Sequence, residues 1–140
     1  MAPTVDINYL AVLVSAIVSM GLGALWYSPM IFGKMWMKLM NIDEKSMKKA
    51  QKKEMGKSYA IAFAASLLMA YVLAHFVDYA QAKTALEGMQ AGFWIWLGFV
   101  ATITLNSVLW EGRPWKLYLI NAAHYFVSLQ IMGAILAVWV

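Results

Sequence analysis

The stretch LYLINAAHYFVSLQIMGAILAVWV, residues 117–140, contains no Asp, Glu, Lys or Arg. Three further stretches, 7–33, 58–77 and 88–110, also lack these residues, so all eleven basic and seven acidic residues fall outside the four stretches. A helix that crosses about 30 Å of hydrocarbon needs about 20 mostly apolar residues. The sequence therefore predicts four transmembrane helices.

The composition agrees with this prediction. Charged residues make up 13% of the chain, whereas an average soluble domain has roughly 25%. Only short connections remain between the stretches, so we expect a single all-α domain over residues 1–140. Its fold class is a four-transmembrane-helix bundle, with spans at about 7–27, 58–77, 88–110 and 117–140.

The basic residues predict the orientation of the chain. Ten of the eleven lie in segments 34–57 and 111–116, and only Lys83 lies between the second and third spans. The positive-inside rule makes the Lys-rich loop 34–57 cytoplasmic and places both termini outside. The N-terminal residues carry Asp6 and no basic residue, which argues against a cleaved signal peptide.

The partners follow from where the charges lie. The net charge of +4 comes from basic residues beside membrane spans, so we expect the phospholipid bilayer and its anionic headgroups at the cytoplasmic face, and no nucleic acid. The chain has no Cys, which excludes disulfides and thiolate metal sites.

The residues after the first span predict a further helix. Pro29 ends the first helix near Tyr27. Apolar residues then recur at i, i+3, i+4, i+7 and i+8 from Phe32 to Met40, which is typical of an amphipathic helix in the membrane interface. The segment 43–57 is more polar, and either a helix or a loop fits it. This region is either a lipid-sensing or partner-docking element or a solvated basic loop that fixes topology. The candidate lipid-interface residues are Trp26, Lys34, Trp36, Lys38, Trp115 and Lys116.

Small residues recur every four positions in two spans and predict where helices meet. They are Ser15, Ser19 and Gly23 in the first span, and Ala62, Ser66, Ala70 and Ala74 in the second. In lipid, close backbone approach through small residues supplies much of the packing between helices. The partner helices belong either to the same chain or to another copy, and we expect a homo-oligomer.

Neutral polar residues in the last two spans form the candidate site. Asn121, His124 and Ser128 are spaced i, i+3 and i+7, so they share a helix face. Asn106 precedes Glu111 by five residues and Asn121 follows Lys116 by five, which places both amides about 7 Å below the cytoplasmic boundary. The predicted cluster is Asn106, Glu111, Arg113, Asn121, His124 and Ser128. It is either a ligand or proton site or a set of hydrogen bonds that hold helices together.

Several chemistries are excluded or disfavoured. No span contains the Asp or Glu that a carboxylate-driven antiporter needs. Haem ligation by His75 and His124 would need both at one level, and their predicted levels differ by roughly 15 Å. No phosphate-binding loop, zinc-helix motif or nucleophile elbow is present. The sequence therefore indicates no catalytic residue and no metal ligand, and it implies no cofactor.

Two motifs carry a resemblance. They are WYSPMIFGKMW at 26–36 and EGRPWK at 111–116, the second flanked by Asn106 and Asn121. With these motifs the chain resembles, over nearly its full length, the bacterial integral-membrane family of unknown function catalogued as domain of unknown function 1761. The resemblance implies a small four-span protein of the bacterial cytoplasmic (inner) membrane, and it carries no activity.

Three function classes follow for this multi-pass membrane protein. The first is a non-enzymatic module that binds lipid, a lipophilic molecule or a partner helix. The second is an oligomeric channel or transporter of a small solute. The third is a membrane enzyme acting on a lipophilic substrate. We expect the first.

Overall fold

The computed structural model describes residues 5–41 and 44–139, and every regular element in these ranges is helical. The prediction of an all-α fold is therefore confirmed. The elements in chain order are α1 (Tyr9–Trp26), α2 (Gly33–Leu39), α3 (Glu44–Tyr79), α4 (Ala85–Ile95), the π-helical turn η1 (Trp96–Val100), α5 (Ala101–Thr104), α6 (Asn106–Leu109) and α7 (Trp115–Val138).

Four helices are long and apolar enough to cross a membrane. They are Tyr9–Trp26, Gly56–Tyr79, Ala85–Leu109 and Trp115–Val138, and they lie where the four uncharged stretches predict spans. The short helix α2 follows the first of them, in the position of the predicted amphipathic helix. The segment 43–57, which the sequence left open, is helical from Glu44 and continues into the second long helix without a break. Residues 42 and 43 lie outside the described residues.

Local sequence signals account for the helix boundaries. The side chain of Asn8 caps α1 by accepting hydrogen bonds from the backbone N–H groups of Leu10 and Ala11, both at 3.1 Å, as an N-cap residue should. The helix ends at Trp26, three residues before Pro29. Helix α7 starts directly after Pro114, whose fixed φ suits a helix start.

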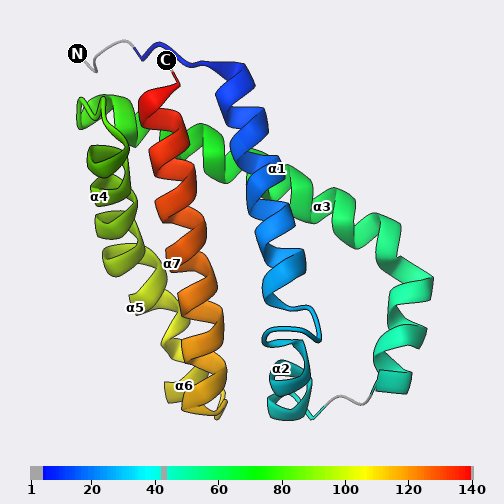
Figure 1. Ribbon diagram of the computed structural model, residues 1–140. Coiled ribbons are helices and arrows are strands. Elements are labelled where there is room, and N and C mark those ends of the chain that lie inside the picture. Colours follow the sequence, from blue (N-terminus) through cyan, green and yellow to red (C-terminus); the bar gives the residue numbers. More distant parts are fainter. Residues whose placement is uncertain (1–4, 42–43, 140) are drawn as a thin grey trace.

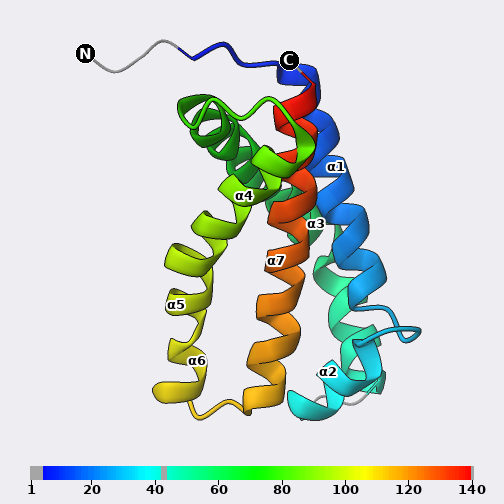
Figure 2. The same cartoon turned by 60° about the vertical axis from the view of Figure 1, so that its left-hand side comes forward.

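Helix α7 lies in the middle of the molecule (Figure 1). It packs against α1 on one side and against α4 on the other, while α3 crosses behind both α1 and α7. The start of α1 and the end of α7 lie at one end of the molecule, and α2 and the turn between α6 and α7 lie at the other (Figures 1 and 2). We call these the terminal end and the α2 end.

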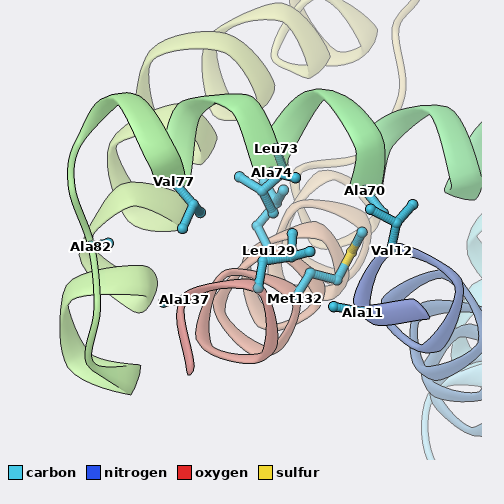
Figure 3. Packing of buried hydrophobic residues seen from close by; sticks show 11 residues of the cluster. Ala11, Val12, Ala70, Leu73, Ala74, Val77, Ala82, Leu129, Met132 and Ala137 are labelled. Atoms are coloured by element: carbon cyan, nitrogen blue, oxygen red, sulfur yellow. The ribbon is translucent and has the colours of Figure 1, made fainter. Parts of the chain in front are cut away.

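The hydrophobic core lies where α1, α3 and α7 meet, toward the terminal end (Figure 3). Small side chains dominate it, and its largest fully buried hydrophobic residues are Leu73 of α3 and Met132 of α7. The buried cluster consists of Ala11, Val12, Ala70, Leu73, Ala74, Val77, Ala82, Leu129, Met132, Leu136 and Ala137. The predicted small-residue rows supply part of this packing, since Ser15, Ser19, Ser66, Ala70 and Ala74 are buried, whereas Ala62 is exposed.

Glycines bring α4 and α7 into direct backbone contact. A Cβ added to Gly92 would lie 2.5 Å from the carbonyl oxygen of Leu129. One turn earlier, Gly88 and Gly133 meet so closely that a Cβ on either would overlap the carbonyl oxygen of the other. The spacing Gly88-x3-Gly92 is the small-residue motif that permits such approach in membrane helices. It was not among the rows singled out from the sequence.

Candidate functional site

The third apolar helix is irregular in its second half. The π-helical turn spans Trp96–Val100, and the hydroxyls of Thr102 and Thr104 donate to the carbonyls of Gly98 at 2.8 Å and Val100 at 2.6 Å. Hydroxyl bonds to the carbonyl four residues earlier tend to bend helices, and π-turns often occur at functional sites. A further break at Leu105 separates α5 from α6. Because of these irregularities, the ribbons of α5 and α6 diverge from α7, whereas α4 packs closely against it (Figure 2).

Three aromatic side chains form hydrogen bonds that connect α7 to the helices on either side of it. The indole N–H of Trp26 donates to the carbonyl of Ile120 at 3.1 Å, and that of Trp96 donates to the carbonyl of Ala122 at 2.8 Å. From α7 itself, the hydroxyl of Tyr118 donates to the carbonyl oxygen of Ala101 at 2.7 Å. Helix α7 is therefore held from both sides near its α2 end, although the helices on either side of it are not packed against each other there.

A cavity of about 780 Å³ occupies this space, with the turn after α1 and helix α2 on one side and α5, α6 and α7 on the other. Ligand pockets commonly measure about 300 to 1,000 Å³. Its lining combines four aromatic rings with several neutral polar groups and one carboxylate. The lining residues are Tyr27, Pro29, Gly33, Trp36, Met37, Ile103, Thr104, Asn106, Ser107, Glu111, Tyr118, Asn121 and Tyr125.

One short hydrogen bond shapes the wall between α1 and α7. The hydroxyl of Tyr27 donates to Oδ1 of Asn121 at 2.6 Å. The ring of Tyr27 also packs edge-on against Trp36, with ring centroids 5.9 Å apart. The bond uses the acceptor oxygen of the amide and leaves the two N–H donors of Asn121 for another partner.

Helix α2 forms part of the cavity wall. Gly33 is buried against the turn that precedes it, and a Cβ there would lie 2.7 Å from the carbonyl oxygen of Ser28. Only glycine permits this approach, and the approach brings Trp36 and Met37 to the cavity. The predicted interface residues Lys34 and Lys38 of the same helix are exposed and do not line it.

The structure brings three of the six predicted cluster residues to the cavity, namely Asn106, Glu111 and Asn121. His124 lies behind the wall, with its ring centroid 5.3 Å from that of Tyr27. A Cβ built on Gly23 would lie 3.4 Å from its Nε2. Both His124 nitrogens are buried and have no hydrogen-bond partner among the described residues.

The other two cluster residues lie elsewhere. Ser128 is buried in the contact between α7 and α1, where its hydroxyl lies 2.8 Å from that of Ser19. Arg113 is exposed, does not line the cavity, and donates its backbone N–H to the carbonyl of Ser107 at 2.9 Å. Ser128 thus serves helix packing, and Arg113 belongs to the turn before α7.

The predicted lipid-interface residues fall into two groups. Lys34 and Lys38 of α2, and Trp115 and Lys116 at the start of α7, are exposed. Trp26 and Trp36, by contrast, are partly buried.

Several lining residues were missed by reasoning from the sequence, above all the tyrosines. Tyr118, Asn121 and Tyr125 are spaced i, i+3 and i+7 and therefore share one face of α7. This spacing was a signal that the amide faces an aromatic surface. In the part of the chain that the structure describes, no three His, Asp or Glu side chains gather in a way that could hold a metal ion.

Comparison with known proteins gives one match. The family model described as "Protein of unknown function (DUF1761)" matches residues 10–137. No curated protein and no solved structure matches the chain. The matched range includes every residue that lines the cavity.

Proposed function

Because the chain belongs to the DUF1761 family of proteins of unknown function, we propose a function from its cavity: the protein is a small multi-pass membrane protein that binds a lipophilic small molecule. The observation that carries this proposal is the cavity of about 780 Å³, whose lining combines four aromatic rings with neutral polar groups and one carboxylate. Binding sites for small molecules are mostly apolar and use a small number of placed polar groups to orient the ligand.

The polar groups are suited to orient a ligand. Asn121 is held by Tyr27 at 2.6 Å, so its amide N–H donors have a defined direction. Asn106 lines the cavity from α6. A ligand with an apolar body and one polar end would be fixed by these amides while its body contacts the rings.

The packing supports binding rather than passage. The cavity lies toward the α2 end, and at the other end of the helices the space between α1, α3 and α7 is filled by the core. Leu73 and Met132 of that core are at most 2% exposed. A solute path through one chain would have to cross this packed region. Transport would therefore require a path between two copies of the chain or a large rearrangement of the helices.

The setting of the protein is part of the proposal. The basic asymmetry supports placing the α2 end at the cytoplasmic face of the bacterial inner membrane, with both termini outside. The exposed residues Lys34, Lys38 and Lys116 at that end would then meet anionic headgroups. We further propose a homo-oligomer, since most residues of the four apolar helices are not buried within one chain.

Native mass spectrometry tests the binding proposal. Wild-type protein, extracted in a mild detergent, is expected to retain a small-molecule adduct. In Ser107→Phe a ring would enter the cavity from α6, and the adduct should be lost. Leu109→Phe, at an exposed position of α6 outside the lining, is the matched control and should keep it. Equal adduct occupancy in wild type and Ser107→Phe, or a wild type without any adduct, would refute the proposal.

A further inference from the structure

We infer that the ligand of this cavity is an organic cation: a positively charged group on an apolar body. This inference rests on the proposed binding function and adds the charge class of the ligand. Among the described residues that line the cavity, Glu111 is the one with a formal charge. A charge that enters an apolar cavity needs an opposite charge or hydrogen bonds as compensation, and here the available charge is negative.

Four described basic residues close to the cavity in sequence do not change this assignment. Lys34, Lys38, Arg113 and Lys116 lie near the cavity in sequence, yet none of them lines it, and all four are exposed to solvent. Exposed charges are screened over about a Debye length. Glu111 is exposed as well, and it differs from these four residues in that it lines the cavity.

The aromatic rings also favour a cation. Tyr27, Trp36, Tyr118 and Tyr125 all line the space. The face of an aromatic ring attracts a cation within about 6 Å of its centroid, and tryptophan is the best partner. The same ring faces repel an anion.

Three hydroxyl donors of the lining are already in use, whereas the two N–H donors of Asn121 remain for a polar group of the ligand. The hydroxyl protons of Tyr27, Tyr118 and Thr104 are donated to Asn121 Oδ1, the Ala101 carbonyl and the Val100 carbonyl. Each hydroxyl has one proton to give, so these three cannot also bind an anion. Their oxygens still have lone pairs that an ammonium donor can use. The carboxylate of Glu111 and the aromatic rings therefore both favour a cation.

A pair of ions of matched shape tests the inference. Tetraphenylphosphonium and tetraphenylborate have the same arrangement of four phenyl rings and opposite charges. Equilibrium binding of each is measured on purified wild type, on Glu111→Gln and on the control Asp78→Asn, which removes an exposed carboxylate on α3 outside the cavity lining. In the control, the affinities for both ions should equal those of wild type.

Glu111→Gln is expected to weaken phosphonium binding by about fivefold, the upper range for an exposed ion pair, and to leave borate binding unchanged or stronger. Unchanged phosphonium affinity in Glu111→Gln, or borate bound as tightly as phosphonium by wild type, would overturn the inference. If Ser107→Phe binds both ions as tightly as wild type does, the ions do not bind in this cavity and the proposed function fails with the inference. If Ser107→Phe loses affinity for both ions but wild type binds them equally well, the cavity is a binding site without charge preference. That result contradicts the inference of a cation and leaves the proposed function standing.

The natural cation could be a lipid headgroup or a free molecule, and a competition arm separates them. Phosphonium binding is measured in nanodiscs of phosphatidylglycerol with and without phosphatidylethanolamine. Weaker apparent affinity with the ethanolamine lipid identifies the headgroup ammonium as an occupant. An unchanged affinity identifies a free lipophilic cation as the ligand class.

Discussion

The contact between α4 and α7 leads to a sharp prediction about Gly92. In Gly92→Ala the new Cβ would lie 2.5 Å from the Leu129 carbonyl oxygen, whereas ordinary contact begins at 3.4 Å. The two backbones must therefore separate by about 0.9 Å, and overpacking of this kind typically costs about 1 to 3 kcal/mol. A gap of this width also forfeits a quarter to a half of the dispersion energy of the atoms it parts.

The matched control is Gly21→Ala on α1. This glycine is exposed, and an added Cβ meets nothing within 4 Å. Alanine is a better helix former than glycine by about 0.8 to 1 kcal/mol, so the control should be neutral or more stable than wild type. The free energy of unfolding is measured by titration with sodium dodecyl sulfate in mixed micelles, followed by far-ultraviolet circular dichroism. If Gly92→Ala were as stable as Gly21→Ala, the backbone contact between α4 and α7 would be refuted.

Two further substitutions are tested in the same unfolding assay. His124→Phe keeps most of the ring packing on α1 and removes two buried nitrogens that have no partner among the described residues, so its stability should equal or exceed that of wild type. His124→Ala removes the ring as well and should lower the free energy of unfolding by about 1 to 3 kcal/mol. Equal losses in both variants would show that the nitrogens are bonded. Trp96→Phe removes the indole donor to the Ala122 carbonyl and should lower the free energy of unfolding by about 0.6 kcal/mol. A stability equal to that of wild type would mean that this bond contributes nothing.

The long helices could be predicted from the sequence because the underlying cost is large and local. A charged side chain in hydrocarbon is expensive wherever the helix packs, so the uncharged stretch 88–110 was enough to locate the helix at Ala85–Leu109. The spacing of Asn121 and His124 likewise indicated a shared face. What they face depends on neighbouring helices, and only the structure separates the cavity residue Asn121 from His124 behind the wall.

Features that depend on tertiary hydrogen bonds could not be predicted in this way. Trp26 is assigned to the membrane interface by its amphipathic ring, but its N–H finds the Ile120 carbonyl in place of water. The π-turn at Trp96–Val100 has no periodicity signal of its own. The Gly88-x3-Gly92 spacing, by contrast, was readable and was overlooked.

The central claim is that the cavity holds a ligand between α1 and α7. A cryo-microscopy structure of the wild-type protein in bilayer nanodiscs, determined without added ligand, tests it most directly. We expect non-protein density bounded by Tyr27, Trp36, Asn106 and Tyr118, with its polar end toward Glu111 or Asn121. A cavity collapsed by α5 and α6 closing onto α1, or filled by the chain's own side chains, would contradict it.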